Sequence, residues 1–387
     1  MRPFKCCALL CLLPLLVTAA CGDTDSEPAA AEESNNDGGD GGKADIIGED
    51  DRQDLFAFED GSLPKRLARS TAMVMSSTQL DQESDPDHVI LRNMPTLGNA
   101  RQLCDDQPFV EQPSVGFCTA FLVAPDIVVT AGHCLTEREC PTTSFIFGFG
   151  YEEAPEDPIE DLRQIPKEDV YACAEFISVR APQECGDADG MIIRLDRPVE
   201  GREVLTYRRE GQIEPDTEIF MIGHPDGVPS KVATGLTRDP ISEVVFKDNL
   251  DSFGGNSGSP VFNAETGVVE GIRSCSSGEH SVPSEDDPSC KVLYQCEEDG
   301  SDCDIVLGTT YSITHLAPIL DGVLGIEDEV NNDAPPASPC CVSQEGGGCG
   351  DEEIEACVCA EDDFCCTTQW DGGCAAQVER LGCGSCQ

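Results

Sequence analysis

Two short stretches of the sequence hold the residue types that nucleophilic chemistry needs. One is TAGHC at residues 130–134, which ends an apolar run, and the other is GGNSGSP at residues 254–260. A serine hydroxyl is a poor nucleophile until a base takes its proton, and an imidazole titrates in the range where it can do so. Glycines beside the serine let backbone N–H groups point at a developing oxyanion. The chain therefore offers a base, His133, and a nucleophile, Ser257.

The two motifs, in this order, resemble those of the chymotrypsin-like serine peptidases. The GGNSGSP form is similar to that of the bacterial glutamyl endopeptidases, and the likeness extends over about residues 46–325. It implies an all-β fold of two packed antiparallel β-barrels (chymotrypsin-like), at about residues 46–200 and 201–326. It also implies hydrolysis of peptide bonds in protein or peptide substrates, with no cofactor and no metal.

The resemblance implies a role for each residue of the site. In these peptidases the orienting carboxylate opens a strand, and Asp189 opens the matching stretch DGMIIRL. His133 would be the general base and acid, Asp189 its orienting carboxylate and Ser257 the nucleophile. The backbone N–H groups of Gly255 and Ser257 would form the oxyanion hole. Asp187 is the alternative for the carboxylate.

One residue of the serine motif differs from the trypsin-type pattern, and this difference indicates the substrate preference. Asn256 stands where trypsin-type enzymes carry the aspartate that pairs with a new N-terminal ammonium. Glutamyl endopeptidases share this Asn and bind an acidic substrate side chain through a processed N-terminus, a hydroxyl residue and a His. Here the corresponding positions are Ile46, Ser252 and Arg273. A guanidinium binds carboxylates well, so we expect cleavage after Glu or Asp. An outward-pointing Arg273 beside a pocket of another kind is the alternative.

The elements that must position these residues are strands. Apolar runs at residues 118–123 and 127–131 flank a Pro-Asp turn, and a second hairpin is predicted around residues 264–266. With 37 Gly, 26 Pro and no amphipathic helix of three turns, the 387-residue chain suits an antiparallel all-β architecture.

The 74 acidic and 24 basic residues of the chain give a formal charge of −50, which excludes nucleic-acid binding and adhesion to anionic membrane surfaces.

The start of the chain carries an export signal. Residues 1–20 combine a basic start, a short apolar run and small residues, which is typical of a signal peptide. VTAAC resembles the lipobox of bacterial lipoproteins, in which Cys21 would be acylated; plain cleavage is the alternative. Residues 21–45 lack branched aliphatic and aromatic side chains, so they predict a disordered tether or propeptide. We therefore expect an envelope lipoprotein, or a protein secreted after processing before Ile46, whose one membrane contact is this anchor.

The 24 cysteines also indicate an oxidising compartment. Four lie in the first 21 residues, ten in the middle domain and ten in a tail at residues 340–387, after a linker at 327–339. The family resemblance implies a Cys118–Cys134 disulfide. The tail is too small for an apolar core, so disulfides should hold it, with zinc as a lesser alternative. A tethered binding protein, with a peptidase-like scaffold and a binding tail, is the alternative function.

Overall fold

The computed structural model describes most of the chain from residue 43 onward. The described residues are 43–44, 46–182, 187–238, 244–275, 281–296, 304–305, 308–325, 340, 346–370, 374, 377–378 and 381–383. The predicted signal peptide, Cys21 and the linker at 327–339 lie outside them, as does most of the tether. Among the described helices, none has the length and apolar character needed to cross a bilayer.

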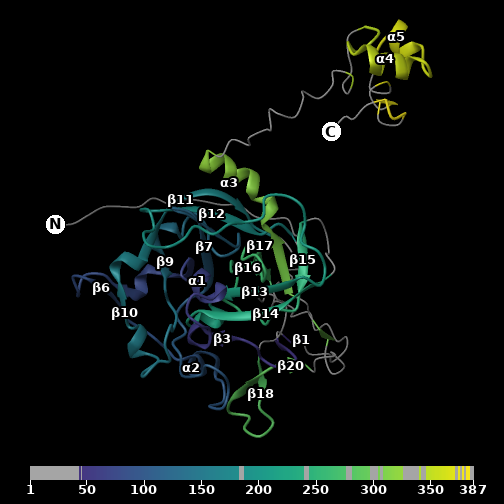
Figure 1. The fold of residues 1–387 in the computed structure, drawn as a ribbon. Coiled ribbons are helices and arrows are strands. Elements are labelled where there is room, and N and C mark those ends of the chain that lie inside the picture. The colour runs from purple at the N-terminus through teal and green to yellow at the C-terminus, as the bar shows by residue number, and fades with distance from the viewer. Residues whose placement is uncertain are drawn as a thin grey trace, which may run out of the picture. The chain divides into compact units, whose positions relative to one another are not determined.

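The first barrel is a closed ring of six antiparallel strands (Figure 1). The ring runs β11-β12-β8-β7-β4-β9 and returns to β11. The Pro-Asp turn of the sequence joins β7 to β8, as predicted. The strands are β4 (Thr71–Ser76), β7 (Cys118–Ala124), β8 (Ile127–Thr130), β9 (Thr143–Phe147), β11 (Val170–Arg180) and β12 (Gly190–Leu195).

The second barrel also closes with six strands, since β13 pairs with both β16 and β14. The predicted hairpin around residues 264–266 joins β16 to β17. The prediction of two antiparallel barrels is thereby confirmed. The strands are β13 (Glu218–Gly223), β14 (Lys231–Arg238), β15 (Val245–Asp248), β16 (Pro260–Asn263), β17 (Val269–Cys275) and β22 (Gly308–Ser312).

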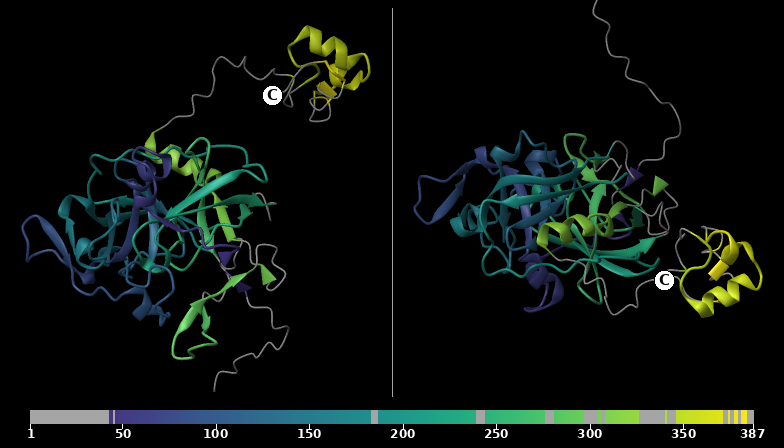
Figure 2. Two further views of the ribbon diagram at one scale, coloured as in Figure 1. Left: turned by 60° about the horizontal axis from the view of Figure 1, so that its bottom comes forward. Right: turned by 90° about the horizontal axis from the view of Figure 1, so that it is seen from above.

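The barrel strands are continuously apolar because both of their faces are covered. On β8, Val128 points into the first barrel, whereas Ile127 and Val129 join a core shared with Phe220 and Ile272 of the second barrel. This alternation follows from the two-residue period of a strand. The shared core packs the barrels side by side (Figure 2) and fixes the loops between them, where the candidate site lies.

The segment from residue 43 to residue 54 pairs with the second-barrel side, although the sequence placed it at the start of the first barrel. It supplies three two-residue strands: β1 (Lys43–Ala44) pairs with β21 (Asp304–Ile305), β2 (Ile46–Ile47) with β20 (Gln295–Cys296), and β3 (Gln53–Asp54) with β14. Besides short 3-10 turns, the other strands and α-helices described before the tail are β5 (Leu80–Asp81), β6 (His88–Leu91), β10 (Gln164–Pro166), β18 (Ser281–Pro283), β19 (Lys291–Leu293), α1 (Leu63–Ala68), α2 (Leu97–Arg101) and α3 (Ala317–Leu324).

The tail is a small disulfide-bonded unit with two short helices, α4 (Glu352–Cys359) and α5 (Phe364–Thr367). Its core is the fully buried Trp370, whose indole N–H donates to the Cys340 carbonyl at 2.9 Å. Cysteines occupied in disulfides are not thiolate ligands for zinc. Four bridges occupy eight of the tail cysteines: Cys340–Cys349, Cys357–Cys383, Cys359–Cys366 and Cys365–Cys374.

Candidate active site

His133 lies on a tight turn directly after β8. The turn leaves no room for a side chain at Gly132, where a Cβ would lie 2.0 Å from the Arg180 carbonyl oxygen. A disulfide joins Cys134 to Cys118 on β7, with 6.1 Å between their Cα atoms. The His133 side chain is 39% exposed. The strand end and the disulfide thus hold an accessible imidazole in place.

Asp189 is the carboxylate that orients this imidazole. It lies just before β12, is fully buried, and accepts the Nδ1–H of His133 at 2.7 Å and the His133 backbone N–H at 3.1 Å. The hydroxyl of Ser274 on β17 donates to the same carboxylate at 2.6 Å. Nδ1 therefore carries the proton and Nε2 is left basic, as a general base requires. The alternative carboxylate, Asp187, is exposed and lies at the surface.

Tyr311 packs beside this carboxylate. Its ring lies where a side chain on Gly190 would be, 2.9 Å from a Cβ built there. Burial, and to a smaller extent the nearby Asp189 carboxylate, raise the pKa of Tyr311 to about 12. The phenol is therefore neutral at neutral pH and adds no second negative charge beside Asp189.

The loop that carries Ser257 depends on two glycines with positive φ. Gly255 has φ +92°, and a Cβ there would lie 2.4 Å from the His224 carbonyl oxygen. Gly258 has φ +88°, and a Cβ there would lie 2.1 Å from the Thr119 carbonyl oxygen. Other residues rarely adopt this conformation. Both glycines are needed because β7 and the 224–227 loop press directly on the serine loop.

Hydrogen bonds to the loop orient its peptide groups. The Gly254 carbonyl accepts the Asp226 N–H, so the N–H of Gly255 points the opposite way. The Thr119 N–H and hydroxyl donate to the Ser257 and Gly255 carbonyls at 2.8 and 2.9 Å. Within the described part of the chain, the N–H groups of Gly255 and Ser257 donate to no protein acceptor. These are the two donors that the family resemblance assigns to an oxyanion hole.

The His133 turn and the serine loop are in contact. Cys134 Sγ lies 3.6 Å from the Ser257 carbonyl oxygen, and Cys134 is the residue next to His133. The turn that carries His133 and the loop that carries Ser257 are therefore adjacent. An oriented base, a serine and two backbone donors are the groups that acyl transfer uses.

The residues assigned to substrate binding are placed differently from expectation. Arg273 is 2% exposed, and its guanidinium donates to Ser252 Oγ at 2.9 Å and to Asp248 at 2.6 Å. Asp248 is fully buried and also accepts the Thr310 hydroxyl at 2.7 Å. The structure thus brings Arg273 and Ser252 together, but Asp248 already neutralises the guanidinium. Asp248 lies only four residues before Ser252, but no motif in the sequence marks it as a partner of Arg273.

Ile46, the third assigned residue, is buried along β20 in parallel pairing with Gln295. Among the contacts between described residues, none joins it to Ser252 or Arg273. The residues that do reach the serine loop from this segment are Asp51 and Arg52, five and six positions later. The cluster of acids around one base, DDRQD at residues 50–54, is a signal in the sequence that could have identified them.

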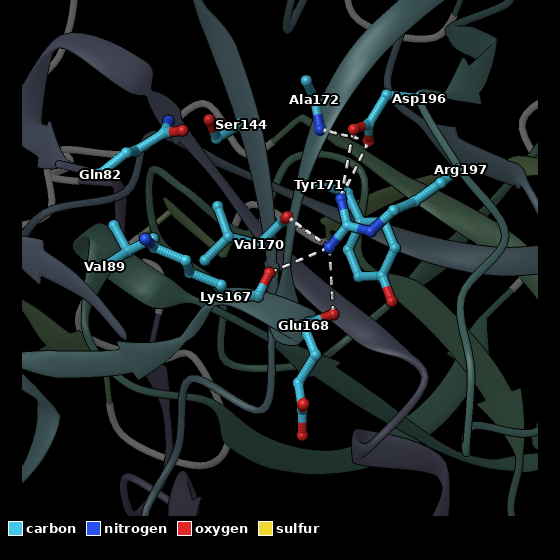
Figure 3. Close-up of a pocket in the computed structure, with 10 residues that line it drawn as sticks. All are labelled: Gln82, Val89, Ser144, Lys167, Glu168, Val170, Tyr171, Ala172, Asp196 and Arg197. Carbon is cyan, nitrogen blue, oxygen red and sulfur yellow. Dashed lines mark hydrogen bonds and ion pairs between the residues drawn. The ribbon is translucent and has the colours of Figure 1, made fainter. Parts of the chain in front are cut away.

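A separate cavity of about 410 Å³ lies against β9 and β11 of the first barrel (Figure 3). Arg197 stacks on Tyr171 at 4.0 Å and donates to the carbonyls of Lys167 and Val170, each at 2.9 Å. It also pairs with Asp196 at 3.2 Å. Because the cation is already satisfied by the protein, the cavity is a structural feature of the barrel and gives no candidate binding site.

The middle of the chain is similar to a known peptidase domain. Residues 118–272 match the family model described as a trypsin-like peptidase domain, and this span contains His133, Asp189 and Ser257. No curated protein matches the chain. Among solved structures, the human heparin-binding protein is 13% identical with a TM-score of 0.42, over 68% of this chain and 94% of that one. The VesB protease of Vibrio cholerae is 12% identical with a TM-score of 0.42, over 72% and 68%.

Proposed function

We propose that this protein is an exported serine endopeptidase that acts through His133, Asp189 and Ser257. The observation that carries the proposal is the buried Asp189 carboxylate, which accepts both the ring and the backbone N–H of His133 beside the serine loop. A merely structural histidine would not need a carboxylate holding its tautomer next to two unused backbone donors. The match to a trypsin-like peptidase domain supports the same chemistry and implies protein or peptide substrates.

The reaction has two halves. In the first, His133 Nε2 takes the proton of Ser257 Oγ as this oxygen attacks the carbonyl carbon of the scissile bond. The N–H groups of Gly255 and Ser257 stabilise the oxyanion, and the imidazolium then gives its proton to the leaving amine. Water repeats the sequence on the acyl-enzyme, which releases the acid and restores Ser257. Asp189 stays ionised throughout and stabilises the imidazolium.

A pair of aspartate variants tests this assignment. Asp189→Asn presents the wrong partner to His133 Nδ1 and should lower kcat by about 10⁴, by analogy with other triads. Asp187→Asn is the matched control, because this carboxylate is exposed, and it should leave kcat within about twofold. Steady-state hydrolysis of a peptide library substrate provides the measurement. Equal losses in both variants, or a greater loss in Asp187→Asn, would contradict the assignment.

Cleavage after Glu or Asp is a narrower proposal, and the pairing of Arg273 weighs against it. Asp248 is fully buried and already pairs with the Arg273 guanidinium at 2.6 Å. A substrate carboxylate would therefore have to compete with Asp248 for this cation. Matched peptides that differ only before the scissile bond decide the point. Wild type should not prefer Glu, and Asp248→Asn should raise the relative kcat/KM for Glu. A strong wild-type preference for Glu that Arg273→Ala removes would establish the acid-specific pocket.

Export and anchoring complete the proposal. The signal-like residues 1–20, the lipobox-like Cys21 and the cysteine-rich composition support an exported lipoprotein that can be released by cleavage in the tether. Metabolic labelling with a radiolabelled fatty acid tests it, with Cys21→Ser as the variant. The label should be present in the wild type and lost in the variant.

A further inference from the structure

Residues 50–54 lie across the serine loop, and we call them the N-terminal strap. One end is tied to the second barrel by β3, and by Lys231, whose ammonium donates to Asp54 and Gln112 at 2.7 Å each. Lys231 is 2% exposed, so this ion pair is an interior contact. The strap is thus anchored independently of the residues that precede it.

The middle of the strap contacts the serine loop directly. The Asp51 N–H donates to the Asp251 carboxylate at 3.0 Å, and the Asp51 carboxylate accepts the Thr234 N–H at 3.0 Å. The Arg52 guanidinium lies 4.1 Å from the centre of the Phe253 ring. Asp251 and Phe253 are six and four residues before Ser257, at the start of the loop.

Arg52 is held in position before any substrate arrives. Its side chain is 2% exposed and forms a two-point ion pair with Asp50, at 2.8 and 2.6 Å. Its guanidinium also lies 5.2 Å from the centre of the Phe109 ring, so it stacks near two aromatic residues. A desolvated cation over an aromatic face is attracted to it, and Arg is suited to such stacking. Phe253, itself 2% exposed, is therefore fixed by the strap.

The position of Phe253 affects the backbone N–H groups of Gly255 and Ser257, the proposed oxyanion donors. The Phe253 carbonyl accepts the Asn256 N–H at 3.1 Å, which closes the turn that contains Gly255 and leads to Ser257. Asn256 has no charge with which to recruit a new N-terminal ammonium. The cation that supports this loop is instead an internal guanidinium, which is present in the uncut chain.

We infer that Arg52 is a positioning residue for the serine loop, and that Ser257 is competent without cleavage before Ile46. The inference rests on the proposed peptidase function. Arg52 acts through Phe253 and touches neither the substrate nor the reacting atoms. Because Gly255 and Ser257 N–H groups act in the transition state, loosening the loop should lower kcat and kcat/KM together and leave KM nearly constant.

Variants of the full-length protein test the positioning role. Arg52→Ala should lower kcat about tenfold or more, with KM within about twofold, since one misplaced donor costs far more than this. Arg52→Lys keeps a cation over Phe253 and should recover most of the loss. Arg66→Ala is the control, because Arg66 forms an exposed pair with Glu203 at 3.2 Å, and it should change nothing.

Stability measurements distinguish a fall in kcat caused by a displaced serine loop from one caused by unfolded protein. Each variant is assayed well below its own thermal unfolding midpoint, where nearly all of the protein is folded. A loss of activity caused only by unfolding would not be seen under these conditions. The double variant Arg52→Ala/Phe253→Leu should be no slower than the slower single variant, because both act through one contact. Full activity in Arg52→Ala, additive losses in the double variant, or no recovery in Arg52→Lys would overturn the positioning role.

The intact chain tests the second half of the inference. Asp45→Pro blocks cleavage before Ile46, and a fluorophosphonate probe should label its Ser257 within about threefold of the wild-type rate, with mass spectrometry confirming the uncut N-terminus. Labelling that occurs only after cleavage would overturn the inference and leave the peptidase function standing. Absence of labelling in cut and uncut protein alike would overturn both.

Discussion

Substituting Gly255 by alanine should disable the site through one steric contact. A Cβ at this position lies 2.4 Å from the His224 carbonyl oxygen, whereas ordinary contact begins at 3.4 Å, so the backbone must move by about 1 Å. A displacement of this size costs about a hundredfold in rate, and loss of one oxyanion donor costs about 10² to 10³. We therefore expect kcat of Gly255→Ala to fall by about 10² to 10³.

Gly211→Ala separates this clash from simple backbone strain. Gly211 also has positive φ, +73°, but a Cβ there meets nothing within 4 Å. It should lose roughly 1–2 kcal/mol of stability and no activity. Steady-state kinetics, normalised to folded protein by thermal unfolding, measure both variants. Gly255→Ala with kcat within about threefold of wild type would refute the assignment of its N–H to the oxyanion.

Two further predictions concern stability. Burial lowers the pKa of His224 to about 3, so between about pH 6.5 and pH 3 the unfolded chain takes up this proton and the folded chain does not. The free energy of unfolding should therefore drop by about 1.5 kcal/mol between pH 6.5 and 5 in the wild type, and His224→Asn should lack this drop in denaturant titrations; equal slopes would contradict it. Mild reductant should unfold the tail, followed by Trp370 fluorescence, while the barrel domain keeps its activity; loss of both together would contradict separate stabilisation.

Local patterns in the sequence predicted much of the fold. Two short apolar runs on either side of a Pro-Asp turn predicted the β7–β8 hairpin, because strand propensity and turn chemistry depend on near neighbours. The roles of His133 and Ser257 were likewise suggested by short motifs. The contact between Asp189 and His133 could not be read from a local motif, because the two residues lie 56 positions apart in the sequence.

Contacts between distant segments could not be read from the sequence. Arg273 was expected to face a substrate, but β17 and β15 both flank β22, which places Asp248 beside the guanidinium. Ser274 was missed for the same reason: its partner Asp189 is 85 residues away. The role of the strap likewise depends on a contact with Phe253, which lies about 200 residues further along the chain. Side-chain pairing across strands depends on topology, which no local pattern encodes.

Covalent capture of Ser257 tests the central claim most directly. A fluorophosphonate probe reacts with a serine that a neighbouring base has activated, and the adduct can be assigned by peptide mass spectrometry. The full-length protein should take up one probe per chain, at Ser257, and Ser257→Ala and His133→Ala should each abolish or nearly abolish the labelling. A folded wild-type protein that stays unlabelled, or that is labelled at another serine, would contradict the proposal that this site is a working serine peptidase.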